Sequence, residues 1–374
     1  MSVKKICILH DTFLYKWWGE RLILMMWKAL GADIASWFFS AGSFNLRKEW
    51  FKGKMISVSS EVYKKWLRHI KLKLAFLFRT KFLRNYDIVL FSWDSISGVR
   101  NCKKDTLKIY YCHTPPRYIY DLHDLYKVKL GFFRKSFFVV WSKFFQYLYE
   151  RDIKKMDVIL TNSKNTQARI KKYLWLDSIV VYPPVDRLYF RYISDEWYFL
   201  SFARLADAKR VDSIVEAFKK IPDKKLIVIY GKNDPQKDKV MQLAKESSNI
   251  SFITLEDNDK LYEYIWCARA SIYIPIEEDF WMSPVESMSA WKPVIWVDEG
   301  WLKESILHNK TWFLLDKDFT IQDIANTVNI FSAELCASMK ENCEKQAEIF
   351  SLSQFEFKLN TLIDTLYQQK KHTL

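Results

Sequence analysis

Short apolar runs alternate along the chain with longer stretches in which apolar residues recur at helical spacing. The runs are rich in Ile, Val, Leu and aromatic residues and occupy nine segments: 4–9, 87–92, 107–112, 157–162, 197–202, 225–231, 250–254, 270–275 and 293–297. Strands that are apolar throughout are typical of parallel sheets covered on both faces by helices. The pattern therefore predicts an α/β protein with doubly wound parallel sheets.

A proline pair separates the strand–helix series into two halves. Pro183 and Pro184 favour extended chain, so segment 182–190 is predicted to be a linker. A chain of 374 residues is long enough for two domains. We predict Rossmann-like domains over residues 1–187 and 188–352.

Composition and motif spacing exclude several classes of protein. No apolar run approaches the roughly 18 uncharged residues of a membrane-spanning helix. The apolar stretch 6–9 is too short for a signal-peptide core. Six cysteines contain no CxxC pair, which argues against zinc sites and a disulfide framework. We expect a cytoplasmic protein that is soluble or peripheral to a membrane.

The net charge of +14 is unevenly distributed. Residues 1–187 hold 35 Lys and Arg against 15 Asp and Glu, whereas residues 188–374 hold 23 against 29. A basic half can attract nucleic acid, an anionic membrane surface or a phosphorylated substrate. Segments 64–84 and 127–149 interleave basic with apolar residues. This pattern suits helices that lie on an anionic membrane surface. It suits equally well a pair of basic helices that are partly packed into the core.

Candidate chemistry follows the strand predicted at 270–275. A helix is expected to start near Ser283, where Pro284 suits the first turn and the open N–H groups suit a phosphate. Glu278 precedes this helix and Glu286 lies in its first turns, so the two carboxylates could hold the hydroxyls of a nucleotide sugar. A solvated helix start with ordinary surface acids would give the same spacing.

Two further strand ends carry polar residues. Arg204 and Lys209 follow strand 197–202, and two cations at a strand–helix turn can neutralise a diphosphate. His113 follows strand 107–112 and should lie at the carboxyl edge of the first sheet. Basic turns are common and a lone histidine is more often structural, so neither signal is specific alone.

Segment 277–315 resembles the donor-site signature of the retaining family 4 glycosyltransferases, which have the GT-B fold. In that family Glu-x-Phe-Gly precedes Pro-x-Glu, then Met-Ser/Ala-x-Gly-Lys-Pro-Val-Ile and a later Gly-Gly. Arg204 and Lys209 resemble its diphosphate-binding Arg…Lys pair. Segment 16–24 resembles its Gly-Gly-Gly-Glu-Arg loop. Segment 111–115, Tyr-Cys-His-Thr-Pro, resembles members that act on surface polysaccharides, many of them mannosyltransferases.

The resemblance implies an activity and an architecture. It implies GT-B domains facing a cleft, with residues 353–374 forming a helix that returns to the first domain. It implies a retaining, metal-independent hexosyltransferase without a cofactor, which uses a nucleotide sugar such as GDP-mannose in surface polysaccharide biosynthesis. The acceptor would be a saccharide or lipid-linked saccharide at the inner face of the plasma membrane.

The resemblance also assigns the site residues, and no metal ligand is among them. The residues implied for catalysis are His113, Glu278, Arg204 and Lys209. Those implied for donor binding are Trp18, Gly19, Phe280, Trp281, Met282, Ser283 and Glu286. Arg117 and Tyr118 are expected near the acceptor.

Tryptophan and glycine counts are abnormal, with 16 Trp and 8 Gly against roughly 26 Gly at average usage. Six tryptophans stand where the family has glycine: Trp17, Trp18, Trp281, Trp291, Trp301 and Trp312. We interpret this as UGA codons that the organism reads as glycine. Further candidates are Trp27, Trp93, Trp175, Trp266 and Trp296. The alternative is a pseudoenzyme that has acquired bulky plugs.

A rival function is non-catalytic nucleic-acid binding, which the sequence pI of about 9.2 and the aromatic–basic interleaving favour. A binding module would not need the paired glutamates. We therefore expect a glycosyltransferase without a nucleic-acid partner.

Overall fold

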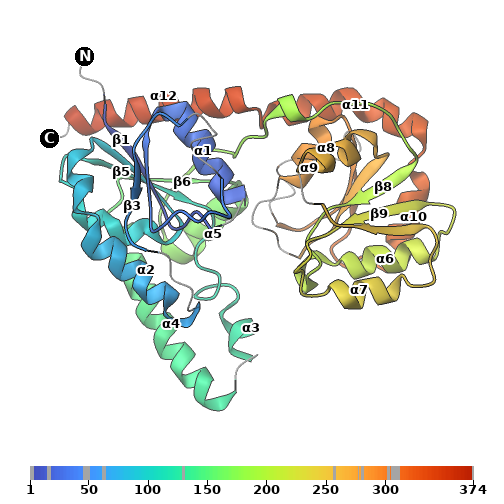
Figure 1. Ribbon diagram of the computed structural model, residues 1–374, viewed down its shortest axis with the longest axis horizontal. Coiled ribbons are helices and arrows are strands. Elements are labelled where there is room, and N and C mark those ends of the chain that lie inside the picture. The colour runs from blue at the N-terminus through green and yellow to red at the C-terminus, as the bar shows by residue number, and fades with distance from the viewer. Residues whose placement is uncertain are drawn as a thin grey trace. The chain divides into compact units, whose positions relative to one another are not determined.

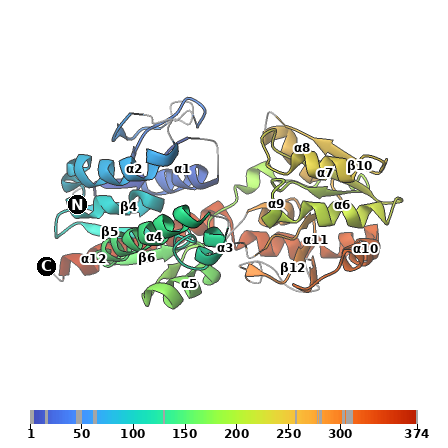
Figure 2. The same ribbon diagram turned by 90° about the horizontal axis from the view of Figure 1, so that it is seen from below.

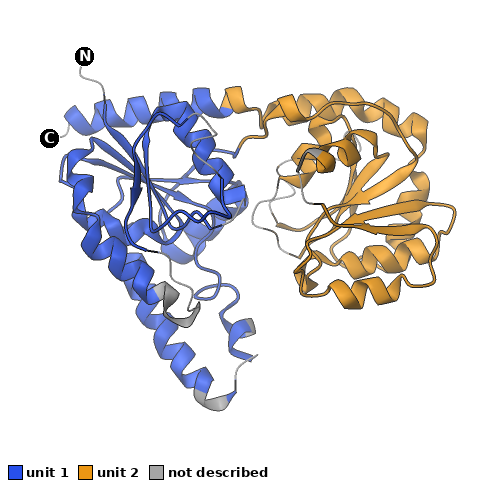
Figure 3. Cartoon of the chain, in the orientation of Figure 1, with its two compact units in different colours: residues 1–183, 355–374 blue, residues 184–354 orange. Residues whose placement is uncertain are grey.

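The computed structural model describes residues 4–14, 18–44, 51–60, 65–128, 131–255, 258–276, 278, 282–300, 304 and 312–372. The chain divides into two compact units, which Figure 3 shows in different colours. Unit 1 holds residues 1–183 and 355–374, and unit 2 holds residues 184–354. These limits lie a few residues from the boundaries predicted at 187/188 and 352/353.

The sheet of unit 1 is parallel throughout its described strands, in the order β3-β2-β1-β4-β5-β6-β7 (Figure 1). The strands are β1 Ile6–His10, β2 Asp33–Ser36, β3 Met55–Ser57, β4 Ile88–Ser92, β5 Leu107–Cys112, β6 Val158–Thr161 and β7 Ile179–Val180. All five residues of β4 are buried, as expected for a strand covered on both faces.

Six described α-helices accompany this sheet (Figures 1 and 2). They are α1 Trp18–Leu30, α2 Lys65–Arg79, α3 His123–Val128, α4 Phe132–Ile153, α5 Lys164–Leu174 and α12 Leu352–His372. The helix α12 begins in unit 2 and runs along unit 1. Its Lys370 Nζ donates to Asp157 Oδ1 at 2.8 Å, and Leu359 and Ile363 are buried.

The sheet of unit 2 is also parallel in its described strands, in the order β10-β9-β8-β11-β12-β13. The strands are β8 Tyr198–Ser201, β9 Lys225–Ile229, β10 Ile250–Ile253, β11 Ala270–Tyr273, β12 Val294–Val297 and β13 Trp312–Leu315. The helices are α6 Val211–Lys219, α7 Lys237–Leu243, α8 Asn258–Cys267, α9 Ser283–Ser289, α10 Ile321–Ile330 and α11 Ala333–Glu348. The helix α6 packs against α7 and α10, and α9 packs against α8 and α11. The predicted α/β class with two parallel sheets is confirmed.

The backbone is left-handed at several tryptophans. Among the described residues, five other than glycine have a positive φ, and four of these are tryptophan: Trp93 (55°), Trp175 (58°), Trp197 (65°) and Trp291 (60°). A bulky residue is rare in this region, because its Cβ crowds the backbone at a cost of roughly 1–2 kcal/mol. These four positions are therefore positions at which glycine is the expected residue.

Candidate functional site

The order of strands in each sheet reverses at one point. The reversal lies between β1 and β4 in unit 1, and between β8 and β11 in unit 2. Open parallel sheets bind ligands outside the carboxyl ends of their strands at such a point. The loops that follow these four strands are therefore the candidate site in each unit.

In unit 2, Lys209, Tyr273 and Glu278 form a cluster at this point. Lys209 Nζ forms an ion pair with Glu278 Oε2 and donates to the Tyr273 hydroxyl at 3.0 Å. The Tyr273 hydroxyl is 3.3 Å from Glu278 Oε2, to which it donates. Burial, followed by the nearby Glu278 charge, raises the pKa of Tyr273, which keeps the phenol protonated. Two predicted site residues thus meet although 69 positions separate them.

Arg210 holds the two loops of this cluster together. Its Nε donates to Ile274 O at 2.6 Å and its Nη2 donates to Pro275 O at 2.9 Å. The same Nη2 lies 3.1 Å from Glu299 Oε1. Sequence reasoning missed Arg210, whose only signal was a basic residue beside Lys209.

Gly300 permits the backbone to approach Glu278. Its φ is +66°, and a Cβ on this residue would lie 2.5 Å from the carbonyl oxygen of Glu278. Any larger residue would displace the loop that carries the carboxylate. Glycine is therefore required here by both conformation and space.

Arg204 lies in the same loop as Lys209 but outside the cluster. Its side chain is 60% exposed, and its Nε is 3.5 Å from Asp234 Oδ1. Asp234 Oδ2 also accepts from the backbone N–H groups of Leu205 and Gly231, at 2.8 and 2.9 Å. Asp234 therefore orders the loop, while the guanidinium of Arg204 remains accessible to solvent.

The helix α9 begins at Ser283, as predicted, and Pro284 lies in its first turn. Met282 and Ser283 are buried, and Glu286 is half-buried one turn into the helix. Phe280 and Trp281 lie outside the described residues. The structure therefore places four of the six donor-site residues expected between Glu278 and Glu286.

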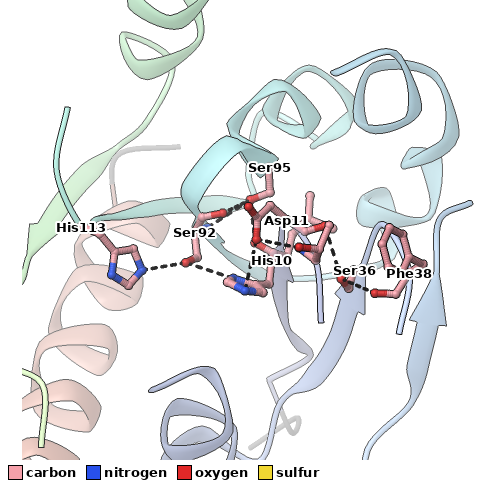
Figure 4. Close-up of polar contacts among 9 residues, drawn as sticks. His10, Asp11, Ser36, Phe38, Ser92, Ser95 and His113 are labelled. Atoms are coloured by element: carbon pink, nitrogen blue, oxygen red, sulfur yellow. Dashed lines mark hydrogen bonds and ion pairs between the residues drawn. The ribbon is translucent and has the colours of Figure 1, made fainter. Parts of the chain in front are cut away.

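In unit 1, Ser92 joins two buried histidines (Figure 4). Ser92 Oγ is 3.0 Å from His113 Nε2 and 3.3 Å from His10 Nδ1, and His10 Nε2 is 3.2 Å from Asp11 Oδ1. Burial lowers the pKa of both histidines to about 3, so both are neutral at pH 7.

The protons are assigned from the chemistry of the partners, since the Asp11 carboxylate can only accept. His10 donates from Nε2 to Asp11 and accepts at Nδ1 from the Ser92 hydroxyl, whose oxygen accepts from His113 Nε2. His10 ends β1, Asp11 follows it and Ser92 ends β4, so the network lies at the reversal point of this sheet. Sequence reasoning found His113 and missed the other three. A His-Asp pair directly after a predicted strand was the available signal.

Trp93 links His113 to the start of α1. Its indole is stacked on the His113 imidazole, with ring centroids 4.6 Å apart and an angle of 11° between the planes. A Cβ added to Gly19 would lie 3.3 Å from Trp93 Nε1. Two predicted site residues thus flank one side chain, which occupies a left-handed backbone position. Trp18 begins α1 beside Gly19, and Trp17 lies outside the described residues.

The expected acceptor residues lie in the turn after β5. Arg117 Nη2 forms an ion pair with Asp121 Oδ2 at 2.8 Å, and Arg169 lies 3.7 Å from the same oxygen. Tyr118 is half-buried, and burial followed by the Asp94 charge raises its pKa.

The two basic–apolar segments form α2 and α4, which are partly packed into the core. Leu72 and Phe76 of α2 are buried, and Lys73 pairs with Asp94 at 3.5 Å, so this charge is not free to meet a surface. The helix α4 buries one face and exposes a second apolar face, which we call the α4 stripe: Phe137, Val140, Phe144 and Tyr147. In the described part of the chain no helix is long and apolar enough to span a bilayer. Nor do its His, Cys, Asp and Glu side chains form a group of three suited to hold a metal ion.

Comparisons with known proteins find a family match within unit 2. Residues 191–349 match the family described as glycosyl transferases group 1. The chain is 32% identical over 133 residues to alpha-1,3/1,6-mannosyltransferase ALG2 of Dictyostelium discoideum. This match covers 35% of the chain and 31% of ALG2, so the chain spans about a third of the length of that relative.

Solved structures match nearly the whole chain. Sucrose-phosphate synthase from Thermosynechococcus elongatus has a TM-score of 0.78 and 13% identity, with 98% of this chain and 100% of that chain covered. Anabaena HepE in complex with UDP has a TM-score of 0.73 and 15% identity, with 96% and 100% covered. These likenesses establish the fold, and the predicted GT-B fold is confirmed.

Proposed function

We propose that this chain, which carries a domain of the glycosyl transferases group 1 family over residues 191–349, transfers a hexose from a nucleotide sugar to a saccharide or lipid-linked saccharide. The observation that carries the proposal is the contact of Lys209 with Glu278 and Tyr273. This cluster lies at the reversal point of the sheet inside the family domain, where a ligand is expected.

The cluster supplies complementary groups for a nucleotide sugar. The cations of Lys209 and Arg204 would hold the diphosphate and stabilise the charge that develops on the leaving group. The Glu278 carboxylate would accept hydrogen bonds from sugar hydroxyls. Without donor, Lys209 and Glu278 neutralise each other. On donor binding, each would exchange this partner for a substrate group, so neither charge would remain buried alone.

We further propose that the reaction is metal-independent and retains configuration. Two cations next to the diphosphate would replace a metal ion, and the acceptor would attack on the face from which the phosphate leaves, with that phosphate accepting its proton. Mannose is the proposed sugar, because ALG2 is a mannosyltransferase, and GDP-mannose is its proposed donor. Product anomers assigned by NMR test retention, and activity in EDTA tests metal independence.

The purified protein should be assayed for nucleoside-diphosphate release against a panel of nucleotide sugars. Lys209→Gln and Glu278→Gln should each lower kcat/KM for the best donor by roughly ten- to a hundredfold, since each removes a charge-assisted contact. Lys219→Gln is the matched control, because Lys219 lies on α6 and pairs with Glu216. Unchanged kcat/KM in both site variants would refute the assigned donor site.

We also propose that the left-handed tryptophans stand at glycine positions, which supports UGA recoding. Positive φ values support recoding at the candidates Trp93, Trp175 and Trp291, and they make Trp197 a further candidate. They do not distinguish Trp18 and Trp312, which lie in a helix and a strand, and the other family-matched positions lie outside the described residues. UGG codons at these four positions would overturn the interpretation.

An anionic membrane surface is the proposed second partner. The α4 stripe is exposed, and Arg134 and Lys135 lie on the same helix. Apolar side chains beside basic ones suit the interface of an anionic bilayer. This surface would keep a lipid-linked acceptor close to unit 1.

A further inference from the structure

A second basic site lies at the opposite edge of the unit 2 sheet. Lys209 and Glu278 follow the carboxyl ends of β8 and β11, whereas this site is formed by residues that precede β8, β11 and β12, together with the helix α11. A cavity of about 200 Å³ is lined there by Tyr192, Asp195, Arg269, Trp291, Lys292, Pro293, Ala333, Cys336, Ala337 and Lys340. Three of these residues are basic and one is acidic.

The three cations are poorly neutralised by the protein. Arg269 is 6% exposed; its Nε donates to Asp195 Oδ2 at 3.0 Å, and its buried Nη2 has no hydrogen-bond partner among the described residues. Lys292 is 2% exposed and donates from Nζ to Ser194 O at 2.5 Å. Among the residues that line the cavity, Asp195 can balance one of these charges, so an excess of positive charge remains in the lining.

Two of the cations share one aromatic ring. Lys292 Nζ and Lys340 Nζ lie 4.0 and 3.5 Å from the centroid of Tyr192. Burial is the main cause that lowers the pKa of Lys292 to about 8, and Lys340 adds to the effect while Asp195 opposes it. A buried charge without an ionic partner is costly. Trp291 also lines this cavity and stacks on Tyr192, although its φ of 60° is one at which glycine is expected.

We propose that this cavity binds a small phosphate-bearing anion, and that it is a ligand site separate from the donor site. A phosphate has enough acceptor oxygens for the free edge of Arg269 and for both ammonium groups. The cavity is larger than a phosphate group and leaves room for a small organic remainder. The ligand is therefore either inorganic phosphate or a phosphate monoester of low mass.

The test uses the full chain with Lys209→Gln, which weakens phosphate binding at the donor site. Inorganic phosphate and glucose 6-phosphate are titrated separately by calorimetry, with glucose as the uncharged control. Binding should persist in this background, and adding Lys340→Gln should raise Kd about tenfold. Lys345→Gln is the matched control, since Lys345 lies on the same helix and pairs with Glu341 outside the cavity. Tighter binding of the ester would identify the organic remainder as part of the ligand.

Sulfate, whose charge is constant between pH 7 and 9, gives an independent measurement. Its affinity should fall over this range as Lys292 loses its proton, and this readout does not need a variant that folds. Absence of binding, binding abolished by Lys209→Gln alone, or binding indifferent to both Lys340→Gln and pH would each overturn the proposal. The first outcome would leave the proposed transferase activity unaffected, because that activity is measured at Lys209 and Glu278.

Discussion

At the scale of single residues, the candidate site of unit 1 contains two neutral histidines. His10 and His113 are buried, and each makes a hydrogen bond with Ser92. A neutral imidazole can donate or accept a hydrogen bond but cannot supply a positive charge to a leaving group. In the proposed reaction, charge stabilisation therefore belongs to Lys209 and Arg204, and His113 would orient a hydroxyl.

Acid should destabilise unit 1 through these histidines. Their pKa of about 3 in the folded state lies below the value of about 6.5 in the unfolded chain, so the unfolded state binds more protons between these pH values. The free energy of unfolding should fall as pH falls, by about 2 kcal/mol per histidine at pH 5. Urea denaturation at pH 7 and pH 5 measures this loss. His10→Gln should lose about 2 kcal/mol less than the unchanged protein, and an equal loss in both would contradict the prediction.

Replacing Trp93 with glycine should expose the imidazole that the indole covers. We expect Trp93→Gly to raise the pKa of His113 from about 3 toward its ordinary value, because burial is the cause of the shift. NMR titration of His113 measures the change. Trp175→Gly is the matched control, because Trp175 has a similar φ and is 81% exposed. Trp175→Gly should stabilise the protein by about 1 kcal/mol and leave His113 unchanged.

At the scale of elements, the α4 stripe provides a direct test of membrane contact. Phe137→Ser with Phe144→Ser should weaken binding to anionic vesicles and leave the fold intact, because both rings are exposed. Co-sedimentation with anionic and neutral vesicles at low and high salt is the measurement. Phe357→Ser on α12 is the control, since Phe357 is equally apolar and 72% exposed. Equal vesicle binding by the two variants would show that the α4 stripe does not contact the membrane.

The sequence predicted strands where apolar residues form an unbroken run, and all nine such segments contain a strand. It missed β2, β3, β7 and β13. The strand β2 reads Asp-Ile-Ala-Ser and β7 has two residues, so neither carries enough apolar signal to stand out. The apolar face of α6 follows helical spacing, because Val211, Ile214, Val215 and Phe218 recur three or four positions apart and are buried.

The candidate site was harder to predict than the fold. Spacing alone identified Lys209 and Glu278 as polar residues at strand ends, but their contact depends on strand order, which brings β8 beside β11. Arg210 donates to backbone carbonyls, and Tyr273 contributes its phenol hydroxyl. No sequence motif marks either kind of contact. The cationic cavity also has no local signature, since Arg269, Lys292 and Lys340 come from three segments.

At the scale of the whole molecule, unit 1 depends on a helix from the far end of the chain. Leu359 of α12 is fully buried, whereas Phe357 on the same helix is 72% exposed. Leu359→Ala should destabilise unit 1 by about 2–5 kcal/mol, and Phe357→Ala should change stability by less than about 0.5 kcal/mol. Hydrogen exchange should report the loss in β1 and β4 and leave β8 and β11 protected. A uniform loss in both sheets would contradict this division.

The same helix affects the order in which the two units can complete their folding during synthesis. The ribosome completes residue 183 long before it reaches α12, and unit 2 is synthesised in between. At about 5–20 residues per second this interval lasts roughly 10–40 s. During that time the surface that α12 will cover is open to water and to other nascent chains. Unit 2 is continuous in sequence and can finish folding first. Unit 1 is therefore synthesised first but completes its core last, when α12 packs against it.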